Sequence, residues 1–111
     1  MIYTPRASDI VLLDFNPQSG HELTKRRPAL VISNDAFNKL SGMAFFCPIT
    51  STRRDYPLRV GLDSRTKTHG FIACDQLKSL DYIARNCHYL ESIPLDIFDV
   101  VLAKVNSIIG I

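Results

Sequence analysis

A long polar connection holds the side chains best suited to binding an anion. Residues 16–27 carry a histidine, a glutamate and three consecutive cations: His21, Glu22, Lys25, Arg26 and Arg27. A hairpin commonly needs about 2–5 residues, so a connection of this length favours a functional role. Pro28 begins the next apolar run. We therefore expect the sheet to hold Arg27 rigidly, as a clamp for an anion.

A second stretch combines hydroxyl groups with cations at the end of an apolar run. Thr50, Ser51 and Thr52 come directly before Arg53 and Arg54. Hydroxyl and guanidinium groups at neighbouring strand ends suit the oxygens of a phosphodiester. Roles in turns and caps are the more ordinary explanation of the three hydroxyl residues, and both interpretations stay open.

Motifs for nucleotide-, zinc- or serine-dependent chemistry are missing from the sequence. Neither GxGxxG nor GxxxxGK[ST] occurs, and neither HExxH nor GxSxG is found. His21, His69 and His88 are scattered, and no set of metal ligands is evident. An enzyme with this sequence is expected to work without a metal and without a cofactor.

The composition predicts one globular domain over residues 1–111. A hydrophobic fraction of 46% and a charged fraction of 22% exclude a disordered or collagen-like chain. No apolar run approaches the roughly 20 residues of a spanning helix, and the N-terminus lacks a secretory signal, so we expect no membrane association. Cys47, Cys74 and Cys87 show no ligand or disulfide spacing. We interpret them as packed, reduced thiols in a cytoplasmic protein.

Charge is spread unevenly along the chain, although its net value is only +2. Cations cluster at residues 25–27, at residues 53–54, and at Arg59, Arg65 and Lys67. Such clusters fit a polyanionic ligand, and an ordinary solvated surface has the same appearance.

Short apolar runs separated by turn residues predict a chain of strands. The predicted strands cover residues 9–15, 28–33, 43–50, 58–62, 70–77 and 84–89, with a helical turn at 35–40. Pro48 suggests an edge or a bulge near the end of the third strand. Many short strands in a small chain favour a barrel, because closure removes exposed edges.

The last part of the sequence changes to a helical period. Ile97, Val101, Val105 and Ile108 recur at helical spacing, after Pro94 and before Gly110. The helix is apolar over more than one face. Either the barrel covers both faces, or a second subunit covers one of them.

Several motifs, in order along nearly the whole chain, together resemble the MazF/PemK toxin family. They are residues 9–17 with Gly20 and Glu22, then residues 27–33, Pro48-Ile49-Thr50-Ser51, residues 75–80 and the closing residues 103–110. Ser8 departs from the pattern, because the family usually has glycine before the first strand.

The resemblance implies a mainly β fold with a C-terminal helix, an SH3-like small β-barrel that assembles as a homodimer. It implies a toxin of a type II toxin–antitoxin system that cuts single-stranded RNA at short motifs without a metal. The ribose 2′-OH attacks the adjacent phosphorus and the 5′-oxygen leaves, giving 2′,3′-cyclic phosphate and 5′-OH ends.

The family's catalytic residues correspond to Arg27, Thr50 and Glu22 of this sequence. Arg27 would grip the nonbridging oxygens, where negative charge builds up. Thr50 would bind the scissile phosphate or orient the 2′-OH, and Glu22 would support the site or act as base. His21 lies outside the strict pattern, but its imidazole suits proton transfer near neutral pH.

RNA recognition is expected from the loops around this site. The predicted RNA-binding residues are His21, Lys25, Arg26, Ser51, Arg53, Arg54, Tyr56, Gln76 and Lys78, with Phe37 as a further candidate for stacking. The implied partners are single-stranded RNA, a second copy of the chain and a MazE-like antitoxin with an acidic segment. DNA would be reached only through that antitoxin.

Two other functions remain open from the sequence. A sister family with the same barrel poisons DNA gyrase and ends in Trp-Gly-Ile. This chain ends in Ile109-Gly110-Ile111, has no tryptophan and keeps Arg27 and Thr50, which disfavours that reading. The other alternative is an SH3-like module that binds RNA or protein without catalysis.

Overall fold

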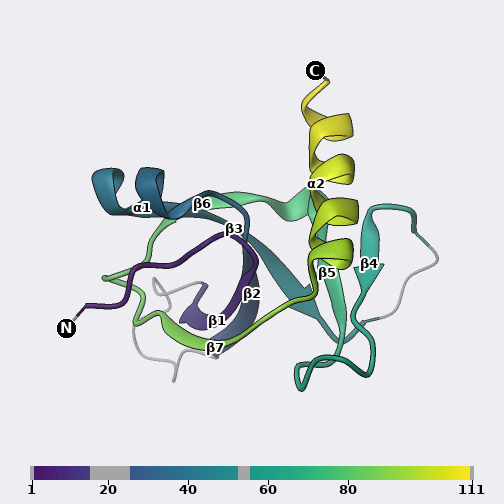
Figure 1. Cartoon of the computed structure of the whole chain (residues 1–111), viewed down its shortest axis with the longest axis horizontal. Coiled ribbons are helices and arrows are strands. Elements are labelled where there is room, and N and C mark those ends of the chain that lie inside the picture. Colours follow the sequence, from purple (N-terminus) through teal and green to yellow (C-terminus); the bar gives the residue numbers. More distant parts are fainter. Residues whose placement is uncertain (1, 16–25, 53–55, 111) are drawn as a thin grey trace.

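The fold is a strongly bent antiparallel sheet with a helix at the end of the chain (Figure 1). The computed structural model describes residues 2–15, 26–52 and 56–110. Its elements are β1 (Asp9–Asp14), β2 (Arg26–Val31), α1 (Asp35–Ser41), β3 (Met43–Thr50), β4 (Arg59–Gly61), β5 (Phe71–Ala73), the 3-10 turn η2 (Cys74–Gln76), β6 (Lys78–Asp81), β7 (His88–Ser92) and α2 (Leu95–Ile109). The mainly β architecture with a C-terminal helix is thereby confirmed.

The long strand β3 organises the sheet. The hydrogen-bonded order is β4-β5-β3-β2-β1-β7, and β6 also pairs with β3. On one side β3 pairs first with β6 and then with β5, and on the other side it pairs with β2. The bend around β3 gives the sheet the curvature of a barrel, while the described strands leave β4 and β7 at the two ends of the path.

Side chains alternate between the two sides of a strand, and an apolar cluster covers each side of the central strands. One cluster packs under α2 and contains Ile10, Leu30, Cys47, Ile49, Ile72, Cys74, Ile93, Ile97, Phe98, Val101 and Val105. The other lies on the opposite face and contains Val11, Leu13, Phe15, Ala29, Val31, Ala44, Phe46, Leu80 and Tyr82. Burying one such large side chain contributes about 1.5–3 kcal/mol, so these clusters fix the positions of the strand ends.

The three cysteines are free and belong to this packed interior or border it. Burial raises the pKa of Cys47 to about 12 and that of Cys74 to about 11. It also raises the pKa of Cys87 to about 12. A thiol in such surroundings is an inert small hydrophobe rather than a nucleophile, which confirms the prediction of packed thiols.

Pro48 lies in a central strand and pairs with Ala29 in a regular register, so the expectation of an edge or a bulge there is wrong. The amide of Ile32 donates to the carbonyl oxygen of Phe45, which places the polar backbone groups of Phe45 on the β2 side. Backbone groups alternate in direction along an antiparallel strand, so those of Pro48 point to the other side. There the partner changes from β6, which pairs up to Phe46, to β5, which pairs from Ile49. A residue without an N–H is tolerated at this change of partner.

The sequence assignment is least accurate between residues 70 and 92. The predicted strand over 70–77 is the short β5 followed by the 3-10 turn η2, and β6 was not predicted as a separate strand. The predicted strand over 84–89 is also wrong in part, because residues 82–86 form turns and β7 spans His88–Ser92. Asn86 has a positive φ of 54°, which a continuous strand does not accommodate.

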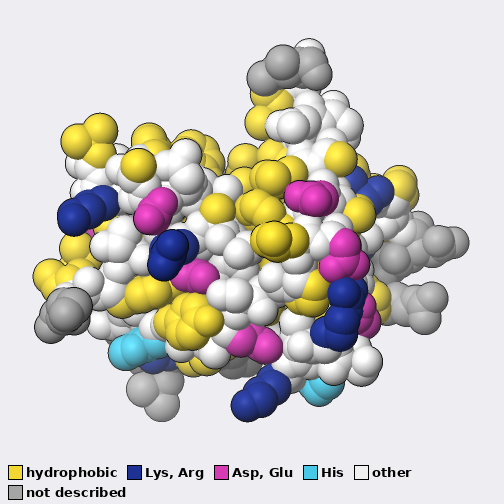
Figure 2. All heavy atoms as spheres, in the orientation of Figure 1, with side chains coloured by type: hydrophobic (Ala, Val, Ile, Leu, Met, Phe, Trp, Pro, Cys, Tyr) yellow, Lys and Arg dark blue, Asp and Glu magenta, His cyan; other side chains and the backbone are white. Residues whose placement is uncertain are grey.

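The C-terminal helix forms where its period predicts, and Gly110 ends it in a left-handed conformation with φ of 84°. Ile97, Val101 and Val105 are buried, but Ile108 is 46% exposed, so the predicted apolar stripe stops one turn early. Hydrophobic side chains gather along α2 on the face shown in Figure 2. No helix in the described part of the chain has both the length and the apolar character needed to cross a membrane.

Candidate active site

Arg27 and Thr50 are brought together by the register of β2 and β3. Ala29 pairs with Pro48 in this antiparallel pair. Continuing the same register by two residues toward the strand ends places Arg27 opposite Thr50. Residues opposite each other share a face of the sheet and have Cβ atoms roughly 5 Å apart. Arg27 and Thr50 come from separate stretches of sequence, but the strand register makes them neighbours. Both line one hollow.

This hollow has a volume of about 330 Å³ and is open to solvent. Its described lining residues are Arg27, Pro28, Ile49, Thr50, Ser51, Thr52 and His69. The Thr50 hydroxyl oxygen accepts a hydrogen bond from the Thr52 amide at 3.1 Å, so the hydroxyl proton stays available for a ligand. The site thus combines an exposed guanidinium with hydroxyl donors, which is a lining suited to phosphate oxygens.

Arg26 lies on the opposite side of the strand from Arg27, and its guanidinium is held by other protein groups. Its guanidinium lies 3.7 Å from the Asp14 carboxylate and donates to the carbonyl oxygens of Leu12 and Asn86. Adjacent residues of a strand point to opposite faces. The structure therefore does not bring Arg26 to the hollow. Arg26 instead connects β2 to β1 and to the turn before β7.

His69 also lines the hollow, although the sequence does not single it out as a site residue. It was one of three scattered histidines, without a motif around it. Thr50 pairs with Phe71, two residues after His69, so the beginning of β5 lies beside the end of β3. This pairing carries His69 into the same hollow as Arg27. Only the strand register reveals this neighbourhood, since about twenty residues of chain separate the two segments.

The other described RNA-binding candidates spread over neighbouring surface. Ser51 lines the hollow, whereas the hydroxyl of Tyr56 donates to a carboxylate oxygen of Asp75 at 3.1 Å. Gln76 is exposed in η2, and the Nζ of Lys78 lies 5.5 Å from the centre of the Phe15 ring. Tyr56, Gln76 and Lys78 are not among the residues that line the hollow.

Phe37 lies on α1, with its ring 5.9 Å from that of Phe45. The remaining candidates, His21, Glu22, Lys25, Arg53 and Arg54, fall outside the residues that the structure describes. Their roles stay predictions.

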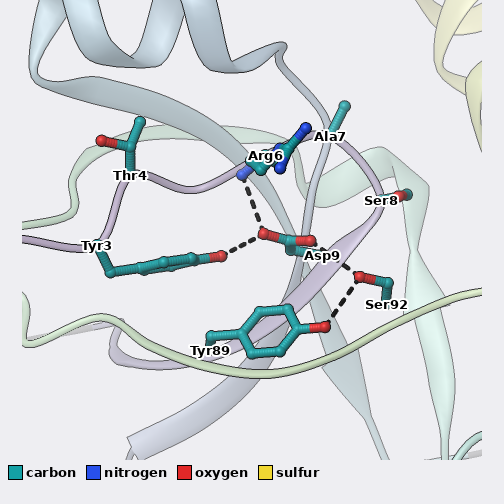
Figure 3. A pocket seen from close by; sticks show the side chains of 8 residues that line it. All are labelled: Tyr3, Thr4, Arg6, Ala7, Ser8, Asp9, Tyr89 and Ser92. Carbon is teal, nitrogen blue, oxygen red and sulfur yellow. Dashed lines mark hydrogen bonds between the residues drawn. The ribbon is translucent and has the colours of Figure 1, made fainter.

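A larger hollow of about 600 Å³ lies beside the N-terminal segment (Figure 3). Its centre is Asp9, which is only 5% exposed. One carboxylate oxygen accepts from the Tyr3 hydroxyl and from the Arg6 amide, and the other accepts from the Ser92 hydroxyl at 3.0 Å. The hydroxyl groups of Tyr89 and Ser92 lie 3.1 Å apart. These polar groups satisfy one another, so the arrangement fastens the N-terminal segment to β1 and β7.

The fold and the lining of the smaller hollow define a class: a small SH3-like barrel that ends in a helix and presents arginine and threonine at facing strand ends. A solved structure of MazE–MazF from Deinococcus radiodurans matches with a TM-score of 0.92 and 38% identity, covering 99% of each chain. The family model described as "PemK-like, MazF-like toxin of type II toxin-antitoxin system" matches residues 6–109. The chain belongs to this family.

Curated relatives agree over nearly the full length. The chain is 32% identical over 108 residues to "Endoribonuclease toxin MazF" of Escherichia coli strain K12, which covers 97% of this chain and 96% of the relative. It is 32% identical over 105 residues to "Endoribonuclease PemK" of Escherichia coli, with 91% and 79% covered. The family resemblance read from the motifs is thus confirmed.

Proposed function

We propose that residues 1–111 form one toxin domain of a type II toxin–antitoxin system, an endoribonuclease that cuts single-stranded RNA at short sequence motifs. The observation that carries this proposal is the common hollow of Arg27 and Thr50 at facing strand ends. The names of the relatives support it, because they are endoribonuclease toxins. The protein acts in the bacterial cytoplasm, where mRNA is found.

The reaction is a transesterification that needs no metal. A base removes the proton of the ribose 2′-OH, and the 2′-oxygen attacks the phosphorus. The P–O5′ bond breaks, and the 5′-oxygen takes up a proton. Arg27 offsets the negative charge on the nonbridging oxygens, and the Thr50 hydroxyl donates to the phosphate. Glu22 is the proposed base.

The proposed partners follow from the charge and surface of the barrel. A MazE-like antitoxin with an acidic, partly disordered segment can cover the hollow at Arg27 by mimicking the RNA backbone. The MazE–MazF structures among the neighbours support this kind of partner. A second copy of the chain covers exposed apolar side chains of α2.

Cleavage of a long natural RNA tests the proposal. The purified protein should cut single-stranded RNA in EDTA and leave duplex RNA and DNA largely intact. The new 5′ ends should accept a phosphate from polynucleotide kinase without prior phosphatase treatment, since they carry 5′-OH groups. Strict dependence on added Mg²⁺, or binding without cleavage, would contradict the proposal. The second outcome would favour the non-catalytic binding module.

A further inference from the structure

We propose that His69 is the general acid of this site and donates the proton that the leaving 5′-oxygen takes up. The inference rests on the proposed endoribonuclease function and adds a residue to its chemistry. Nothing in the motifs shared with the toxin family points to this histidine. Its position in the fold does.

The close approach of two strands holds His69 beside Thr50. The next residue, Gly70, has a positive φ of 131°, and a Cβ at this position would lie 2.6 Å from the carbonyl oxygen of Thr50. Only glycine allows the backbones to come this near. The carbonyl oxygen of Gly70 also accepts from the Leu62 amide at 2.9 Å. The segment that carries His69 is therefore packed directly on the strand end that carries Thr50.

A carboxylate from another strand holds the residues just before His69. Glu91 of β7 accepts from the Lys67 amide at 3.1 Å and from both the amide and the hydroxyl of Thr68 at 2.7 Å. The hydroxyl of Thr66 donates to the Thr68 carbonyl oxygen at 2.8 Å. His69 thus follows an anchored residue and precedes a tightly packed one. An exposed side chain on such a rigid backbone is well placed to act on a bound ligand.

The chemistry of the hollow leaves the acid role to an imidazole. A guanidinium keeps its proton near neutral pH, so Arg27 serves as a fixed cation rather than as an acid. The Thr50 hydroxyl is a weak acid whose proton is better used to bind the phosphate. Imidazole is the group whose ordinary charge change falls between pH 5 and 8. Of the described side chains that line the hollow, His69 alone carries one.

Two different groups move the two protons of the reaction. The proposed base takes the 2′-OH proton as the 2′-oxygen forms its bond to phosphorus. The P–O5′ bond breaks with its electron pair on the 5′-oxygen, which receives a proton from the His69 imidazolium. The imidazole then regains a proton from solvent. No oxidant, reductant or metal enters the step.

A change of leaving atom tests this role directly. The probe is a short oligonucleotide with one ribonucleotide at the cut position, chosen after the cleavage motif has been mapped on a long RNA. It is made in two forms, with oxygen or with sulfur as the 5′ leaving atom. A thiolate leaves without protonation, so a missing general acid matters only for the oxygen form.

We expect His69→Gln to lower kcat/KM on the oxygen form by about 10²–10⁴-fold and to cut the sulfur form at close to the wild-type rate. An equal loss on both forms would overturn the acid role in favour of positioning, and an unchanged rate on oxygen would exclude any role. If the wild-type protein cuts neither form nor the long RNA, the proposed function itself fails, which is a distinguishable result.

Two further measurements guard against a folding effect. His88→Gln removes another exposed histidine, on β7 and away from the hollow, and it should leave both rates unchanged. His69→Ala should recover cleavage of the oxygen form when free imidazole is added, because the small molecule supplies the missing proton. Failure of imidazole to restore the rate in a folded His69→Ala protein would count against the proposal.

Discussion

Ser8 has the backbone conformation of a glycine, with a φ of 78°. Its amide donates to the carbonyl oxygen of Val31, and its own carbonyl oxygen accepts from the Ile93 amide, both at 3.0 Å. These bonds hold the left-handed conformation at the entrance to β1. A side chain in this region costs about 1–2 kcal/mol. This strain gives a physical reason for the glycine that the family resemblance implies before the first strand.

Ser8→Gly is therefore expected to raise the free energy of unfolding, by up to about 1 kcal/mol, because relief of strain outweighs the extra freedom of glycine in the unfolded chain. Urea unfolding measures the change. Asn86→Gly is the comparison, since Asn86 also has a positive φ but donates a side-chain hydrogen bond to Asp14 at 3.1 Å. Asn86→Gly should not raise the free energy of unfolding. A less stable Ser8→Gly protein would contradict the argument.

Arg26 and Arg27 at the start of β2 have different surroundings, because adjacent side chains of a strand point to opposite faces. Arg26 bonds to β1 and to the turn before β7, whereas Arg27 is exposed at the hollow. Sequence alone presents residues 25–27 as one basic cluster. The structure divides the two described members of that cluster into a structural residue and a candidate catalytic residue.

The segment before β5 depends on Glu91 for its position. Burial pushes the pKa of this carboxyl upward, but hydrogen bonds from Thr68 and Lys67 outweigh it and hold the pKa below its ordinary value. A carboxylate whose pKa is lowered by folding stabilises the fold fully above its unfolded-state pKa, about 4.3. That contribution is lost as the pH falls through the lower folded-state value.

Glu91→Gln should lower the free energy of unfolding at pH 7 by about 1 kcal/mol, because the amide offers one acceptor oxygen where the carboxylate offers two. The difference between wild type and variant should shrink below about pH 4, where the wild-type carboxylate becomes protonated. Urea unfolding at pH 7 and pH 3 checks both statements. A difference that does not change with pH would show that the charge of Glu91 is not the cause.

Elements with strong local signals could be predicted from the sequence, and those set by distant pairing could not. The period of α2 and the apolar runs of β1, β2 and β3 are local, and they suffice to place Arg27 and Thr50 at strand ends. The break between β5 and β6 depends on both pairing with one long strand, β3. His69 was missed for the same reason, because its place in the hollow follows from the β3–β5 register.

The helix α2 presents an apolar surface that the barrel does not cover. Leu95 is 69% exposed, Val100 47% and Ile109 56%. The expected interface must use these neighbours of the buried stripe, because Ile97, Val101 and Val105 lie in the core. An exposed patch of this kind commonly marks an interface.

We expect the protein to sediment at micromolar concentration as a species of twice the chain mass. Val100→Glu should shift it to the mass of one chain, since a charge in an apolar interface has no partner. Leu40→Glu on α1 is the matched control, because Leu40 is 89% exposed on another element. A monomeric wild-type protein would contradict the dimer. An equal effect of both variants would place the interface elsewhere.

RNA and the acidic segment of the antitoxin are expected to compete for one surface, because both present an extended polyanion to the same cations. Displacement of labelled RNA by an antitoxin peptide measures this competition. Arg53→Glu combined with Arg54→Glu should weaken both ligands. Simultaneous tight binding of RNA and peptide would show that the antitoxin acts at another site.

The rate of RNA cleavage by Arg27→Ala and by Thr50→Ala shows whether the hollow is the active site. Each variant should fold and lose about 10²–10³-fold in single-turnover rate in EDTA, because each lacks one preorganised donor to the phosphate. Arg6→Ala, which removes an exposed cation near Asp35, should keep the wild-type rate. A folded Arg27→Ala or Thr50→Ala protein that cuts RNA at the wild-type rate would show that the hollow between β2, β3 and β5 is not the active site.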